Sequence, residues 1–292
     1  MTPNVLINFI AHQAKEHKPE TLKQYVSALR SKHVDSGYST KAFEDERLSR
    51  LYKGVPRTHG IKPSRERNEI TKEKLLAMLK RLDVSRHDDA NLYAAFCVAF
   101  AGFLRPGEFT WDKWDPITSP NEHATRQSIQ FTPQGVLFLL PRSKTSIEPV
   151  SIPLASADDA SCPVRALNTL FHLFPRPLNN PLFSRTLGAF NQSWLNQNIR
   201  KTLFEAGFNP TGYSGHCFRR GVANTALDMG LNIDEIKSLG RWNSDAYGKY
   251  QNKQSKEKIK FAVNKQLHLA ALNRRTPFLL LRSTLVPREP SL

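Results

Sequence analysis

Cysteine and long apolar runs are both scarce in this sequence. Its 292 residues include three cysteines, Cys97, Cys162 and Cys217, which lie far apart and show neither disulfide-framework nor zinc-site spacing. No apolar run is long enough to span a membrane, and the first residues lack the pattern of a signal peptide. These absences favour an intracellular protein in a reducing compartment, and we expect no membrane partner.

Acidic residues are also scarce relative to basic ones. The chain carries 42 Lys and Arg against 26 Asp and Glu, a formal net charge of +16. A positive charge of this size favours a polyanionic partner, and nucleic acid is the first candidate. A merely soluble basic protein is the alternative on charge alone. Hydrophobic residues make up 39% of the chain, which is enough to build the cores of two compact domains.

Helical patterns dominate, with a short β region in the middle of the chain. Apolar residues at helical spacing predict three helices in the first 57 residues, and a linker follows at 59–68, where Gly, Pro and charge replace periodicity. Three strand signals at 128–132, 136–140 and 150–154 stand among further helices. We therefore predict a mostly α fold with a small antiparallel β-sheet. The predicted parts are a helical domain at 1–58, an α+β domain at 69–275 and a tail at 276–292.

A charged pair follows the most apolar helical segment. Residues 90–104 are apolar on nearly all sides and predict a buried helix, which Pro106 and Gly107 interrupt. Arg105 and Glu108 stand at that end, where an unpaired charge would be costly. We expect them to contact each other or a ligand, and a helix-terminal salt bridge is the simplest interpretation.

A second group of polar residues begins at the helix expected over 215–229. His216 and Arg219 are three residues apart near its start, so their side chains are neighbours at one flank of the buried stripe. Arg220 is expected to point further out. An H-x-x-R pair alone is a weak signal, because short motifs recur by chance.

Two shorter elements follow that helix. Asn232 is expected to cap a short helix that Gly240 ends, and Trp242 comes next. A last short helix carries Tyr247 and Tyr250. A His, an Arg, a Trp and a Tyr therefore come from three consecutive elements and are able to converge in one pocket.

Taken together, these motifs resemble those of the tyrosine recombinases, the integrase-like DNA strand-exchange enzymes. The similar runs are G-F-L-R-P-G-E around Arg105, R-S-K-T around Lys144, H-x-x-R at His216 and G-R-W-N-S-D-A around Trp242. The last run is most similar to that of crypton-type recombinases of eukaryotic transposons. The resemblance covers about residues 19–270 and implies a helical DNA-gripping domain followed by a catalytic α+β domain. The family's first domain is usually longer, so the present one is expected to be shortened.

The resemblance implies strand cleavage without a metal or any other cofactor. Arg105 and Arg219 would bind the scissile phosphate, since guanidinium forks match phosphate geometry, and Trp242 would add a donor. Lys144 would protonate the leaving 5′ oxygen, and His216 would take the proton of the nucleophile. The product would be a 3′-phosphotyrosine that a second strand can reseal. The implied catalytic residues are Arg105, Lys144, His216, Arg219, Trp242 and Tyr250, with Glu108 in support.

Two tyrosines compete for the nucleophile role. In the familiar members of the family the residue at the Trp242 position lies nine before the nucleophile, whereas Trp242 and Tyr250 are eight apart. Tyr247 is therefore an alternative nucleophile. We expect Tyr250, because it ends the G-R-W-N-S-D-A-x-x-x-Y pattern and its spacing is nearer to nine.

The implied partner is double-stranded DNA, on which a homotetramer would assemble. The protein would be nuclear in a eukaryote, or in the cytoplasm or nucleoid of a bacterium. Three other functions stay open: a type IB topoisomerase, a catalytically inactive domesticated DNA-binding protein, and a structural or protein-interaction module. The charge and the co-occurring motifs disfavour the last of these.

Overall fold

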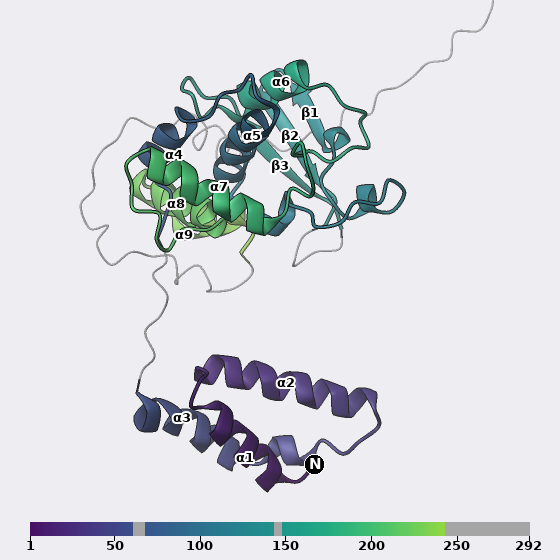
Figure 1. Ribbon diagram of the computed structural model, residues 1–292, viewed down its shortest axis with the longest axis vertical. Coiled ribbons are helices and arrows are strands. Elements are labelled where there is room, and N and C mark those ends of the chain that lie inside the picture. Colours follow the sequence, from purple (N-terminus) through teal and green to yellow (C-terminus); the bar gives the residue numbers. More distant parts are fainter. Residues whose placement is uncertain (61–67, 143–147, 243–292) are drawn as a thin grey trace, which may run out of the picture. The chain divides into compact units, whose positions relative to one another are not determined.

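The computed structural model describes residues 1–60, 68–142 and 148–242. The chain divides between Arg65 and Glu66 into two compact units (Figure 1). The predicted fold class is confirmed, because the described residues form helices and one small antiparallel sheet. Most of the expected linker and the whole of the expected tail fall outside the described residues, and the domain boundaries stay predictions.

The first unit is a small helical bundle. Its elements are α1 (Pro3–Gln13), α2 (Pro19–Asp35), the 3-10 turn η1 (Lys41–Glu44) and α3 (Arg47–His59). Proline opens both α1 and α2, where a missing backbone N–H costs nothing. One apolar stripe from each helix meets the others in a shared core. That core contains Leu6, Ile10, Ala14, Leu22, Val26, Leu48 and Val55.

The second unit contains a three-stranded sheet in the order β1–β2–β3. The strands are β1 (Ile129–Thr132), β2 (Gly135–Leu140) and β3 (Val150–Ala155), and both pairings are antiparallel. Each strand lies within a residue of its predicted range. Thr132 pairs with Gly135, so two residues make the first turn. Leu140 pairs with Val150, and the connection between them contains Lys144, which lies outside the described residues.

Helix α5 (His87–Ala101) is the centre of the second unit and contacts α6 (Pro163–Leu173), α8 (His216–Asp228) and β3 (Figure 1). Its burial on nearly all sides confirms the predicted buried helix. The other α-helices among the described residues of this unit are α4 (Lys72–Leu79), α7 (Gln192–Glu205) and α9 (Ile233–Gly240).

The end of α5 differs from the prediction. The helix was expected to reach Leu104 but stops at Ala101, because Phe103 takes a left-handed conformation with φ 51°. The Leu104 N–H then returns to the Ala99 carbonyl at 3.0 Å and closes the helix. Arg105 therefore follows a tight turn rather than the last turn of a helix.

The segment that enters the second unit lies along α8. The backbone N–H of Ile70 donates to the Cys217 carbonyl at 3.0 Å, and the Arg220 side chain donates to the Asn68 carbonyl at 2.5 Å. A Cβ on Gly221 would lie 1.8 Å from the Ile70 carbonyl oxygen, so only glycine permits this approach. Arg220 lies further out than the buried Arg219, as expected, but it is half-buried and less exposed than His216, and it holds the entering segment.

Within the described parts of the chain, no helix combines the length and apolar character needed to cross a lipid bilayer.

Candidate active site

Arg105 and Glu108 form a closed pair at the turn after α5. Arg105 precedes the 3-10 turn η2 (Pro106–Glu108), and Glu108 is almost completely buried. One Glu108 oxygen accepts from the Arg105 guanidinium Nη1 at 2.9 Å, and the other accepts from the Arg105 backbone N–H at 2.9 Å. The prediction that these two residues meet is confirmed. The carboxylate holds both the backbone and the side chain of Arg105, so the direction of its guanidinium is restricted.

Arg241 joins this pair, although it is not among the site residues predicted from the motifs. Its Nη2 donates to Glu108 Oε2 at 2.7 Å, and its Nη1 donates to the Gly102 carbonyl at 3.1 Å. The Arg241 carbonyl in turn accepts from Arg105 Nη2 at 3.3 Å. A signal for Arg241 was present in the sequence, since Arg241 rather than Trp242 lies nine residues before Tyr250.

Arg219 ties the carboxyl ends of α5 and α9 together. Its Nη1 donates to the Phe103 carbonyl and its Nη2 donates to the Gly240 carbonyl. Gly240 is the last residue of α9, and the last carbonyls of a helix carry partial negative charge that suits a cation. Only 1% of Arg219 is exposed, whereas the sequence suggested a guanidinium presented to phosphate. Its contact with phosphate stays a prediction.

Trp242 packs against the same arginine. The Arg219 guanidinium carbon lies over the Trp242 ring, 4.1 Å from its centre, and Phe103 meets that ring edge-on at 6.2 Å. A desolvated cation over an indole is a favourable arrangement. Trp242 therefore shapes the cluster through its ring, and a role for its N–H toward phosphate stays a prediction.

His216 is the first residue of α8 and is exposed, one helical turn before Arg219. The structure thus brings together four residues of the predicted site and places His216 one turn away. The predicted Lys144, Tyr247 and Tyr250 lie outside the described residues. The four residues that meet are Arg105, Glu108, Arg219 and Trp242.

Among the residues that the structure describes here, guanidinium groups outnumber carboxylates. The guanidiniums of Arg105 and Arg241 share the single carboxylate of Glu108, and Arg219 bonds to carbonyls nearby. Burial lowers the pKa of Arg241, and the charge of Arg105 lowers it further, although Glu108 opposes both. A further anion would relieve the repulsion between these cations, and a phosphate suits guanidinium donors.

Two residues of this cluster also have a strained backbone. Phe103 and Arg241 are the two residues other than glycine with positive φ in the described ranges, at 51° and 55°. Such residues persist only where their surroundings hold them, and they gather at functional sites. Both lie at the helix ends that Arg219 connects.

Across residues 1–60, 68–142 and 148–242, no three His, Cys, Asp or Glu side chains are grouped so as to hold a metal ion.

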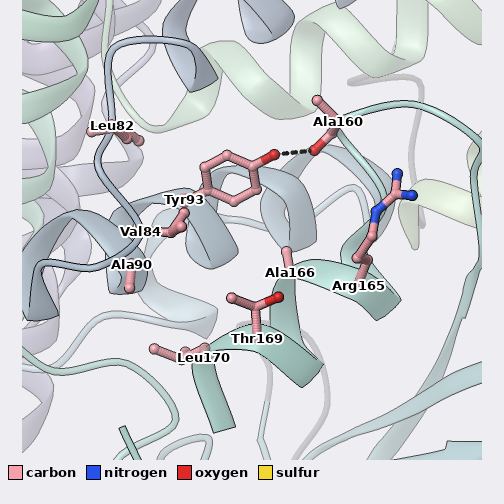
Figure 2. Close-up of a pocket in the computed structure, with 9 residues that line it drawn as sticks. All are labelled: Leu82, Val84, Ala90, Tyr93, Ala160, Arg165, Ala166, Thr169 and Leu170. Atoms are coloured by element: carbon pink, nitrogen blue, oxygen red, sulfur yellow. Dashed lines mark hydrogen bonds between the residues drawn. The ribbon is translucent and has the colours of Figure 1, made fainter. Parts of the chain in front are cut away.

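A pocket of about 320 Å³ lies elsewhere in the second unit, between α5 and α6 (Figure 2). Its lining is mostly apolar and contains none of the predicted site residues. Tyr93 donates from its hydroxyl to the Ala160 carbonyl at 2.6 Å, and Arg165 stands beside it. Burial raises the pKa of Tyr93 to about 12.

Comparison with known proteins places this geometry in context. No family model matches the sequence. An integrase/recombinase XerD homolog of Selenomonas ruminantium is 24% identical over 257 residues, which cover 84% of this chain and 71% of that protein.

Two solved structures share the fold. The XerH site-specific recombinase, bound to a palindromic difH substrate in a post-cleavage complex, aligns with a TM-score of 0.58 and 16% identity over 84% of this chain and 66% of its own. The Tn1549 transposon integrase, in complex with circular intermediate DNA, aligns with a TM-score of 0.55 and 11% identity over 88% of this chain and 83% of its own.

The fold is that of a tyrosine recombinase. The comparisons support the tyrosine recombinase/integrase family that the motifs predicted. The closer resemblance to crypton-type enzymes stays a prediction.

Proposed function

We propose that this protein is a site-specific DNA recombinase or integrase that cuts and rejoins DNA through a covalent 3′-phosphotyrosine. One observation carries the proposal. Arg105 and Arg219 come from motifs far apart in the sequence, yet they donate to consecutive carbonyls, those of Arg241 and Gly240, at the end of α9. This convergence, within a recombinase fold, supports a shared phosphate site.

The proposed reaction needs no metal and no cofactor. The oxygen of Tyr250 attacks the scissile phosphorus, and the bond from phosphorus to the 5′ oxygen breaks. The Tyr250 proton passes to His216, and Lys144 gives a proton to the leaving 5′ oxygen. Charge gathers on the phosphate oxygens in the transition state, where fixed guanidinium donors stabilise it.

Glu108 has a specific role in this scheme. It holds the backbone N–H and the guanidinium of Arg105 at 2.9 Å each, so this cation is oriented before DNA arrives. Donors that need no reorganisation lower the barrier most. Rejoining is the reverse reaction, in which a 5′ hydroxyl of another strand attacks the phosphotyrosine.

Double-stranded DNA is the proposed partner. The net charge of +16 supports it, and XerH and the Tn1549 integrase were both solved with DNA. Exchange between two duplexes, each cut at two positions, requires four protomers, so we propose a tetramer on DNA. If the source is eukaryotic, the closer resemblance to crypton-type transposon enzymes and a nuclear location form part of this proposal.

A nicked suicide DNA substrate tests the function. Its target sequence is first selected from a random library by binding to the protein. Cleavage beside the nick releases a short oligonucleotide and traps the enzyme on DNA, so denaturing electrophoresis should show labelled DNA linked to protein. The yield should be the same with excess EDTA. Binding without any linked product would refute strand cleavage.

The burial of Arg219 favours one competing function, an inactive DNA-binding protein. In that case the arginine cluster would serve stability alone. Both functions predict DNA binding whose affinity falls by about 10³–10⁵ between 50 and 200 mM salt if 6–10 phosphates are contacted. The linked product alone separates them. Relaxation of supercoiled plasmid without a preferred site would instead indicate a type IB topoisomerase.

A further inference from the structure

Arg241 occupies a backbone position that glycine usually fills. It follows the last residue of α9 with φ 55° and ψ 48°, a left-handed conformation. Helices commonly end in this way, and glycine is preferred there because it has no Cβ. An arginine at this place is therefore disfavoured by its own backbone, and only its side-chain contacts can offset that cost.

The Arg241 side chain bridges two elements that are distant in the sequence. It donates to Glu108 Oε2 at 2.7 Å, to the Gly102 carbonyl at 3.1 Å and to the Phe103 carbonyl at 3.5 Å. These contacts fix the end of α9 against the end of α5. Only 14% of the side chain is exposed, so the contacts are largely shielded from water.

Arg241 is connected to Arg105 in two ways. Both guanidiniums bond to the carboxylate of Glu108, and the Arg241 carbonyl accepts directly from Arg105 Nη2 at 3.3 Å. A shift of Arg241 would move an acceptor of Arg105 and release one partner of Glu108. The orientation of Arg105 therefore depends on a residue that belongs to another motif.

We propose that Arg241 is a positioning residue, whose guanidinium holds Glu108 and thereby aims Arg105 at the scissile phosphate. The inference rests on the proposed function and extends it to a residue that has no role in the predicted site. Arg241 acts through Glu108 and Arg105. The contacts of this bridge offset the cost of its left-handed backbone.

Arg241→Gly is the sharpest variant, because glycine suits the left-handed backbone and removes only the bridge. We expect the protein to keep its fold, because glycine relieves the left-handed backbone strain and so offsets part of the loss of the three Arg241 hydrogen bonds. DNA affinity should change less than about threefold, since one phosphate contact of many is disturbed. The single-turnover rate of linked-product formation should fall on the order of 100-fold, as misplaced groups commonly cause.

Two further measurements separate positioning from general stability. Arg241→Lys keeps the charge but provides a single donor group in place of the guanidinium fork. Its cleavage rate should therefore lie between those of the wild type and Arg241→Gly. Guanidinium ion added at millimolar concentration should partly restore cleavage by Arg241→Gly, whereas sodium chloride at the same ionic strength should not. A purely structural residue would show neither effect.

The possible results distinguish a failure of this inference from a failure of the proposed function. Equal cleavage rates in wild type and Arg241→Gly would overturn the inference and leave the proposed function standing. Absence of linked product in the wild type on a verified target would reject the proposed function. The bridge would then be judged from a crystal structure of Arg241→Gly. An unchanged Arg105–Glu108 pair would overturn the inference, and a displaced Arg105 would support it.

Discussion

The Arg219 guanidinium lies over the indole of Trp242, 4.1 Å from the ring centre. Two residues that the sequence offered as separate phosphate ligands are thus packed on each other. The same guanidinium bonds to the carbonyls of Phe103 and Gly240, so the indole ring and the ends of α5 and α9 are held in one cluster. The stability of this cluster should depend on the space beside the Trp242 indole.

Gly240 provides that room. A Cβ at this position would lie 1.6 Å from the Trp242 ring, so the ring must move if alanine is introduced. We expect Gly240→Ala to lower the free energy of unfolding by about 1–3 kcal/mol, the usual cost of overpacking. Chemical denaturation followed by far-UV circular dichroism, which reports the helices of both units, measures the change. Gly54→Ala is the matched control, because Gly54 lies in α3 with nothing within 4 Å of an added Cβ.

Gly240→Ala and Gly54→Ala should change the free energy of unfolding in opposite directions. Alanine in an open helical position stabilises by about 0.5–1 kcal/mol, so Gly54→Ala should not lose stability. A Gly240→Ala variant as stable as the wild type would show that the indole does not occupy the place described above.

Removing the charge of Glu108 should lower the free energy of unfolding. Its carboxylate accepts from Arg105 and Arg241, and only 3% of its side chain is exposed. Glu108→Gln would leave two partly buried guanidiniums without their counter-charge, which typically costs about 3–5 kcal/mol. Urea denaturation measures the free energy of unfolding.

The matched control is Glu205→Gln on α7. Glu205 pairs with Lys201 at 3.8 Å, with 40% and 68% of the two side chains exposed. An exposed pair contributes little, so the control should change stability by less than about 1 kcal/mol. Equal effects of the two variants would contradict the role of Glu108 as the shared anchor.

The Tyr93 hydroxyl should lose its proton at a higher pH than an ordinary tyrosine does. Its hydroxyl lies at the pocket between α5 and α6, where burial raises the pKa to about 12 from an ordinary value near ~10 (Figure 2). The folded protein therefore keeps a proton that the unfolded chain loses above about pH 10. The stability that this proton provides is complete below pH ~10 and is lost as pH rises through about 12.

Phenolate absorbance measures that titration. The difference between wild type and Tyr93→Phe should show one tyrosine ionising near pH 12 while the protein stays folded. A difference curve with its midpoint near pH ~10 would mean that water reaches the hydroxyl freely.

Local sequence patterns predicted much of the fold. The strand β2 is a short apolar run after the turn residues Pro133 to Gly135, and the cap of α9 is an Asn232–Glu235 box, so both could be found from local chemistry. The Arg105–Glu108 pair was also predictable, because charges at the end of a buried helix need partners. These features depend on neighbours within a few residues.

The rest depended on tertiary contacts. Helical spacing placed Arg219 beside the buried stripe, but its burial follows from carbonyls of α5 and α9 that no local pattern reveals. Arg241 was missed because its importance arises from a left-handed cap that points its side chain at Glu108. The early end of α5 likewise follows from the unusual φ of Phe103.

The most direct test of the account is the identity of the nucleophile. The measurement is the fraction of labelled suicide DNA that becomes linked to protein in a denaturing gel. Phenylalanine keeps the ring and removes only the attacking oxygen. Tyr250→Phe should therefore bind DNA like the wild type and give no linked product, whereas Tyr247→Phe should give a normal yield. A linked product that survives in Tyr250→Phe and disappears in Tyr247→Phe would contradict the assignment of Tyr250.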